Sequence, residues 1–179
     1  MLAVVVAVAT VILDQVTKAA VVGGMDLNER SPVFGTFLRL TYIKNSGAVF
    51  GMMKGASTYF TFFSIIAAAV LVVVLIIARR ASTLVRVSLG LVLGGAVGNL
   101  IDRLRFGAVV DFLDVGISES VRWPCFNVAD SAITVGVFLL IISSFAGAEH
   151  GVGADAAGDV SGNGRGGHSG EAAGRTAAE

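Results

Sequence analysis

The residues that could do chemistry in the apolar part of this 179-residue chain are mainly carboxylates, because the usual nucleophile and metal-ligand sets are missing there. Both histidines, His150 and His168, lie near the C-terminus, and Cys125 is the single cysteine. A Ser-His-Asp or Cys-His nucleophilic site and a His-ligated zinc site are therefore excluded from residues 1–147. Catalysis in that part of the chain would depend on Asp, Asn, Lys, Arg, Ser or Thr.

Two aspartates stand in strongly apolar surroundings. Asp111 lies inside "GAVVDFLDV" (107–115), and Asp130 opens a long apolar run in "FNVADSAITVG" (126–136). If the first stretch folds over the start of that run, the two carboxyl groups meet. Two carboxylates in one desolvated site cannot easily both ionise, so one keeps a proton. Such a pair suits amide hydrolysis, in which one carboxylate activates water and the other protonates the leaving amine.

Four apolar segments must position these groups, and each is about as long as a membrane crossing. They are residues 2–22, 57–78, 84–102 and 128–148. With 55% hydrophobic and 15% charged residues, the composition is that of a membrane protein. The first segment is expected to be retained, because it has no Lys or Arg before it and no clear small-residue cleavage site. A short cytoplasmic lead is expected ahead of it.

Charge predicts the orientation in the membrane. The connection after the second segment carries Arg79, Arg80 and nearby Arg86 and no acid, so the positive-inside rule places it in the cytoplasm. Both termini are then cytoplasmic, and loops 23–56 and 103–127 face outward. No basic patch suggests nucleic-acid binding.

The outward loop 23–56 is expected to hold strands. Residues 34–45, "FGTFLRLTYIKN", are rich in aromatic and β-branched types, which predicts two short strands turning near "NSG". The Gly/Ala-rich tail 148–179 has no core-forming pattern and is predicted to be disordered. The chain is therefore divided into a membrane-embedded domain, 1–147, and a cytoplasmic tail.

Polar residues of three predicted helices fall at one depth in this arrangement. With a rise of about 1.5 Å per residue, they lie within about two or three turns of the outer surface. A charged side chain in the bilayer interior costs at least ~2.5–3.5 kcal/mol, so such groups usually face one another inside a bundle. The sequence therefore predicts one polar site near the outer boundary. Its members are Asp14, Lys18, Asn99, Asp102, Arg103, Asn127, Asp130, Ser131 and Thr134.

Five motifs, matching in order and spacing across residues 1–147, resemble those of the bacterial lipoprotein signal peptidases (signal peptidase II). They are "LDQVTK" (13–18), "NSGAVFG" (45–51), "GGAVGNLIDR" (94–103), "GAVVDFLDV" (107–115) and "FNVADSAITVG" (126–136). The resemblance implies an all-α polytopic membrane protein with four transmembrane helices and a small extracytoplasmic β-cradle. It implies an intramembrane aspartyl protease that cuts a prolipoprotein just before a cysteine that already carries diacylglyceryl.

By motif position, the resemblance makes Asp111 and Asp130 the catalytic pair. It adds substrate-binding or site-supporting residues, which are Asp14, Asn45, Asn99, Arg103 and Asn127. Asn45 and Arg103 suit hydrogen bonds to backbone carbonyls of the substrate. Asn99 and Asn127 suit orienting the pair, whereas Asp14 suits fixing the first helix to the loop.

The resemblance implies no metal or cofactor and places the enzyme in the bacterial cytoplasmic (inner) membrane as a monomer. The expected partners are a diacylglyceryl-modified prolipoprotein and membrane lipid. Other functions remain open. A small ion or proton carrier could use intramembrane acids as a relay, although carrier sites tend to lie near the midplane. A non-catalytic membrane scaffold is the third possibility, but it does not explain a pair of acids near the start of the fourth helix.

Structural interpretations of single residues also remain open. Asp14 and Lys18 suit an i,i+4 pair in which Lys18 extends outward to the interface. Asp102 suits a local pair with Arg103 or Arg105.

Further residues have plainer roles than catalysis. Asp114 suits a solvated loop acid or a cap, and Asn127 suits capping of the fourth helix. Cys125 suits inert packing, and Trp123 and Tyr42 suit anchoring at the membrane interface.

Overall fold

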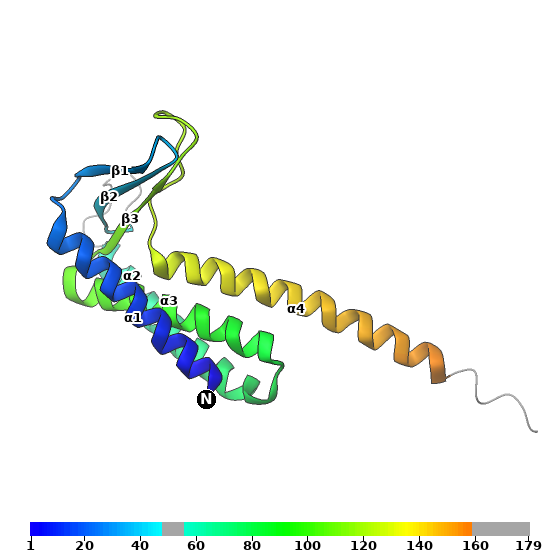
Figure 1. Ribbon diagram of the computed structural model, residues 1–179. Helices are drawn as coiled ribbons and strands as arrows, with labels where there is room; N and C mark the ends of the chain where they lie inside the picture. Colours follow the sequence, from blue (N-terminus) through cyan, green and yellow to red (C-terminus); the bar gives the residue numbers. More distant parts are fainter. Residues whose placement is uncertain (48–55, 159–179) are drawn as a thin grey trace, which may run out of the picture. The chain divides into compact units, whose positions relative to one another are not determined.

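The computed structural model describes residues 1–47 and 56–158, with side chains described for 1–47 and 58–145. Within this part of the chain, four helices are long and apolar enough to cross a membrane. The predicted polytopic helical fold is confirmed (Figure 1). The helices are α1 (Leu2–Gly24), α2 (Ala56–Ile77, continued by the short 3-10 helix η2, Ala78–Arg80), α3 (Thr83–Phe106) and α4 (Val128–Gly158).

Helix α3 has well-defined ends. Ser82 Oγ accepts a hydrogen bond from the Val85 backbone N–H (3.3 Å), which caps the N-terminus. Gly107 adopts φ 68° and ends the helix in the left-handed conformation, which a residue without Cβ adopts at little cost. The helix therefore runs to Phe106, beyond its predicted end at 102.

Glycines let α3 approach two other helices closely. A Cβ at Gly94 would lie 2.6 Å from a side-chain carbon of α1, and one at Gly98 would lie 2.5 Å from the Asp14 carboxylate. A Cβ at Gly95 would collide with the backbone carbonyl of Ala129 in α4. The small residues predicted to favour close helix packing therefore bring α1, α3 and the start of α4 together.

A three-stranded antiparallel sheet lies at one end of α1 (Figure 1). Its strands are β1 (Arg30–Phe34), β2 (Leu38–Asn45) and β3 (Val109–Val115), in the order β1-β2-β3. The predicted turn near "NSG" is wrong, because the chain turns between β1 and β2, where Gly35 has φ +52°. Strand β3 comes from residues 103–127, the other loop that was predicted to face outward, and was not predicted as a strand.

A small apolar cluster joins the sheet to the end of α1. It consists of Val21, Tyr42, Val110 and Phe112, all buried. Tyr42 is only 5% exposed, so its predicted place at the membrane interface is wrong. Its ring instead helps to hold β2 and β3 against the helix. Trp123, at 71% exposure, remains available for the interfacial position.

The internal contacts of the chain divide it at Ser143–Ser144, so the end of α4 belongs to a second unit. Helix α4 continues through it to Gly158, beyond the predicted end at 148. Residues 159–179 lie outside the described part of the chain, so the disorder predicted for the tail stays a prediction there. The division into a membrane domain and a cytoplasmic tail also stays a prediction.

Candidate active site

The start of α4 is built around Asn127. Its Oδ1 accepts a hydrogen bond from the Asp130 backbone N–H (2.9 Å), and Asp130 Oδ2 accepts one from the Asn127 backbone N–H (3.3 Å). This reciprocal arrangement is a capping box, which satisfies two N–H groups at the helix start. The predicted capping by Asn127 is confirmed, and the same contacts hold the Asp130 carboxylate in the first turn.

Asp111 projects from β3 and is 1% exposed. Asn127 Nδ2 donates to Asp111 Oδ1 (2.7 Å), and Asn45 Nδ2, from the end of β2, donates to Asp111 Oδ2 (2.9 Å). Asn127 therefore contacts both candidate catalytic carboxylates, one through its side chain and the other through its backbone. The sheet and α4 are joined at this residue.

Asn99, from α3, completes the amide framework. Its Nδ2 donates to Asp130 Oδ1 (2.7 Å), and its Oδ1 accepts from Asn127 Nδ2 (3.2 Å). Arg103, one turn later, donates from Nη1 to the Asn99 carbonyl (3.3 Å). The residues predicted to meet at one depth on separate segments do lie together.

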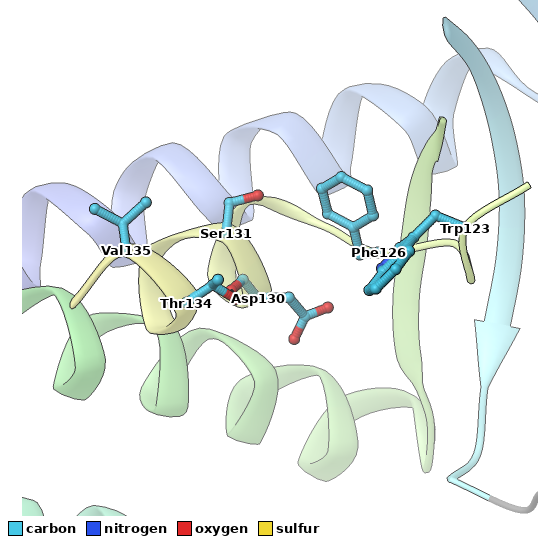
Figure 2. A pocket seen from close by; sticks show the side chains of 6 residues that line it. All are labelled: Trp123, Phe126, Asp130, Ser131, Thr134 and Val135. Atoms are coloured by element: carbon cyan, nitrogen blue, oxygen red, sulfur yellow. The ribbon is translucent and has the colours of Figure 1, made fainter. Parts of the chain in front are cut away.

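A cavity of about 420 Å³ opens onto Asp130. Figure 2 shows its lining, in which Trp123 and Phe126 precede α4 while Ser131, Thr134 and Val135 lie on its first turns. The Asp130 carboxylate is therefore accessible from outside the amide framework. Asp111 lies deeper.

The environment of Asp111 favours its protonated form. Burial raises the pKa of this carboxyl group from its ordinary 3.8 to about 6, and the nearby Asp130 carboxylate acts in the same direction. The hydrogen bonds from Asn45 and Asn127 oppose the shift in part. Among the described residues, the ion pairs of the chain involve neither Asp111 nor Asp130.

Lys18 is the buried cation beside this pair, and it is only 3% exposed. Its Nζ lies 2.9 Å from Asp14 Oδ2 and 2.8 Å from Asp102 Oδ2, and it donates to Asn99 Oδ1 (3.0 Å). The i,i+4 pair with Asp14 is confirmed, but the predicted outward course of Lys18 is wrong. Three inward acceptors match the three N–H donors of the ammonium group.

The two carboxylates paired with Lys18 each hold a backbone N–H next to a candidate catalytic residue. Asp14 Oδ1 accepts from the Ala129 N–H (2.9 Å), and Asp102 Oδ2 accepts from the Val110 N–H (3.0 Å). Ala129 and Val110 immediately precede Asp130 and Asp111 in the chain. Lys18 therefore links the two backbone segments that carry the pair.

These contacts correct two predictions. Asp102 does not pair locally with Arg103 or Arg105, since its oxygens accept from Lys18, Gln15 and the β3 backbone. Asp14 fixes α1 to the first turn of α4 rather than to the outward loop.

Asp114 lies in a second ionic cluster, on the sheet. It contacts Arg122 Nε (2.5 Å) and Arg39 Nε (3.4 Å), and it accepts from Thr41 Oγ1 (2.9 Å). Burial alone would raise its pKa, but the hydrogen bonds from Arg122 and Thr41 outweigh that effect and lower it. The prediction of a solvated loop acid is wrong, because the residue is only 7% exposed and its carboxylate contacts two arginines.

Cys125 adds no reactive group to the site. Burial raises the pKa of the Cys125 thiol to about 12, and its Sγ lies 3.5 Å from the Thr41 carbonyl. The thiol therefore stays protonated, as expected of a packing residue. Over the described residues, no group of three or more His, Cys, Asp or Glu side chains could hold a metal ion.

Comparison with known proteins matches this arrangement. The family described as Signal peptidase (SPase) II matches residues 6–146. The chain belongs to this family. The lipoprotein signal peptidase of Syntrophotalea carbinolica is 45% identical over 78% of this chain and 88% of its own length. That of Syntrophus aciditrophicus is 43% identical over 73% and 84%.

A solved structure agrees with the fold. It is described as a bacterial membrane enzyme determined by the in meso method at 1.9 Å resolution. It superposes with a TM-score of 0.68 at 36% identity, covering 79% of this chain and 90% of that one. This signal peptidase II family member is thus a multi-pass membrane peptidase, and the family removes signal peptides from lipoproteins.

Sequence reasoning placed Lys18 and Asp102 among the polar residues of one site but did not pair them, and it gave Gln15 no place there. Gln15 Nε2 contacts Asp102 Oδ1 (3.0 Å) and the Gly98 carbonyl (3.2 Å), which ties α1 to α3. One signal could have found the pairing of Lys18 with Asp102. Three charges at the same depth cannot stay unpaired in a bilayer, so one cation between two acids is the simplest way to neutralise them.

Proposed function

We propose that this signal peptidase II family member is an intramembrane aspartyl endopeptidase. It removes the signal peptide from diacylglyceryl-modified prolipoproteins by cutting immediately before the lipidated cysteine. The observation that carries the proposal is the pair of a buried Asp111 and a part-buried Asp130, both contacted by Asn127 and open to a cavity on the Asp130 side. The family assignment favours a peptidase over the ion or proton carrier and the scaffold.

In this proposal the two carboxyl groups have different roles. A pKa of about 6 suits Asp111 to hold the shared proton. Asp130 accepts hydrogen bonds from Asn99 and Asn127 and is the group nearer to solvent, which suits the ionised base. Asp130 takes a proton from water as the water oxygen adds to the scissile carbonyl, and Asp111 gives its proton to the leaving amine.

The supporting residues divide between the pair and the substrate. The amide of Asn45 already contacts Asp111, so we assign it to positioning that carboxyl group rather than to the substrate. Arg103 makes one hydrogen bond to the Asn99 carbonyl, and a guanidinium has five N–H donors. Arg103 therefore retains donors for a substrate backbone carbonyl, as its motif position implies.

The proposed setting is the inner membrane, with the site near its outer face. The basic residues Arg79, Arg80 and Arg86 support a cytoplasmic α2–α3 connection, and hence cytoplasmic termini. The acyl chains of the substrate stay in the bilayer while the peptide reaches the cavity at Asp130. The enzyme acts as a monomer and needs no cofactor.

The test is cleavage of a purified diacylglyceryl-modified prolipoprotein, with EDTA present, by the wild type and by Asp111→Asn and Asp130→Asn. Each substitution is expected to lower kcat by about 10²–10⁴-fold, which is the usual contribution of a general acid or base. Asp26→Asn removes an exposed carboxylate from the 23–56 loop and is expected to leave kcat unchanged.

The unmodified prolipoprotein serves as the second substrate and is expected to resist cleavage. Substantial activity of Asp111→Asn or Asp130→Asn would contradict the catalytic role proposed for that residue. If the folded wild-type protein does not cleave a verified lipidated substrate, the proposed peptidase activity is contradicted and the ion or proton carrier or the membrane scaffold becomes the better hypothesis.

A further inference from the structure

Two cations share one aromatic ring at the end of α3. The Lys44 ammonium lies 5.6 Å from the centroid of the Phe106 ring, and the Arg105 guanidinium carbon lies 5.1 Å from it. In the described residues, the ion pairs of the chain include neither cation. Within the described part of the chain, these two like charges are therefore held near one ring without an acidic ion-pair partner.

A groove of about 220 Å³ begins beside this pair of cations, between the C-terminal ends of α1 and α3. Arg105 belongs to both the groove and the cation pair. The apolar part of the groove is formed by Ala19, Val22, Gly23 and Phe106. This shape suits a narrow apolar chain that ends in an anionic group.

The polar part of the groove reaches the Lys18–Asp102 ion pair. That pair is buried, and Asp102 holds the backbone of β3 next to Asp111. Whatever fills the groove therefore decides whether water reaches the ion pair from this side.

The depth of the groove identifies the partner class. Helices α1 and α3 end at Gly24 and Phe106, and the ends of membrane helices lie at the level of the lipid headgroups. Leu104, in the same last turn of α3, is 63% exposed and is expected to face acyl chains. At this level the abundant anion is a lipid phosphate, and basic pockets between membrane helices bind such headgroups.

We propose that this groove binds one anionic phospholipid of the outer leaflet. Its phosphate lies between Lys44 and Arg105, and the upper part of one acyl chain fills the groove beside Val22. The charge of the two cations fits a phosphodiester, and the apolar walls fit the chain attached to it. The bound lipid keeps water from the Lys18–Asp102 pair and so stabilises the segment that carries Asp111.

The test measures lipid retention rather than cleavage, so it does not depend on the proposed reaction. The intact protein in detergent is titrated with phosphatidylglycerol, and bound lipid is counted by native mass spectrometry alongside the thermal midpoint. We expect one retained lipid and a raised midpoint in the wild type. Arg105→Gln or Lys44→Gln is expected to weaken binding about fivefold, from the usual contribution of one basic residue near anionic lipid.

Arg30→Gln is the matched control, because it removes one exposed cation from β1, outside the groove. If Arg30→Gln weakened lipid binding as much as Arg105→Gln does, binding would reflect general charge attraction and not a site at Arg105. Phosphatidylcholine bound as tightly as phosphatidylglycerol would overturn the role of the cations. If inorganic phosphate raised the thermal midpoint as much as phosphatidylglycerol does, the proposal that the ligand is a phospholipid would be contradicted. Val22→Trp fills the groove and leaves both cations in place, so undiminished lipid retention in that variant would overturn the acyl-chain position.

Discussion

Asp111 and Asp114 lie three positions apart on one strand, yet their environments act in opposite directions. Burial raises the pKa of Asp111 to about 6, whereas Arg122 and Thr41 lower the pKa of Asp114. Both carboxylates are buried, so burial alone does not explain the difference. The difference lies in the partner, since Asp114 contacts guanidinium groups and Asp111 contacts the amides of Asn45 and Asn127.

The same contrast divides the acids inside the helices. Asp14 and Asp102 share the Lys18 ammonium, whereas Asp130 is held by Asn99 and the backbone of Asn127. A cation stabilises a carboxylate in its charged form. An amide fixes the position of a carboxyl group and adds no net charge. Ion-paired acids here connect the helices and the sheet, whereas Asp111 and Asp130 are held in position by amide groups without a paired cation.

The largest effect on stability is expected from removing the cation of the framework. Lys18→Met leaves the Asp14 and Asp102 carboxylates buried without their partner, which typically costs 3–5 kcal/mol, roughly, in unfolding free energy. Unfolding in matched detergent measures the loss. Arg30→Met, at an exposed position, is the control and is expected to change stability little. A Lys18→Met protein as stable as the control would show that the ion pairs do not hold the framework.

A smaller but more selective effect is expected from the Asn127 side chain, which contacts Asp111 and caps the helix turn that carries Asp130. Asn127→Ala removes that cap, which costs about 1 kcal/mol, and it removes one of the two amide hydrogen bonds to the Asp111 carboxylate. We expect kcat for lipidated prolipoprotein to fall by about 10²-fold, since positioned acid–base pairs contribute at least that much.

Ser82→Ala is the control that distinguishes the loss of a helix cap from the loss of contacts at the candidate active site. It removes the cap of α3, far from the amide framework in sequence, and is expected to cost a similar free energy of unfolding with kcat unchanged. Equal loss of kcat in the two variants would mean that Asn127 acts only through helix stability.

The smallest effect is expected in the pH dependence. If Asp111 holds the shared proton, kcat/KM falls as pH rises through about 6. Stability follows the same sign. The folded pKa of about 6 exceeds the ordinary 3.8, so the contribution of Asp111 is fully present below 3.8 and is lost as pH rises through 6.

In Asp111→Asn the side chain does not ionise, so this variant does not lose stability in that way as pH rises. Thermal midpoints measured at pH 4 and pH 8 are therefore expected to show the variant gaining on the wild type at the higher pH. A difference between the two proteins that is independent of pH would contradict the raised pKa.

The sequence alone predicted the helices and the meeting of the site residues, because length, hydropathy and membrane depth are local properties. It did not predict which acid pairs with which base. Asp102 is adjacent to Arg103 in the chain but contacts Lys18 on α1, since neighbouring residues of a helix point in different directions. Strand β3 was missed because a short apolar run has no periodicity that separates a buried strand from other structures.

The hydrogen bond from Ala129 to Asp14 spans 115 positions of the chain. During synthesis, Asp14 and Lys18 emerge together, one helical turn apart, and their charges can cancel while the first helix enters the membrane. Asp102 follows with α3, and Asp130 arrives only with α4. The ribosome thus delivers the residues of the Lys18 ion pairs before Asp130, so a half-inserted chain lacks one member of the proposed catalytic pair.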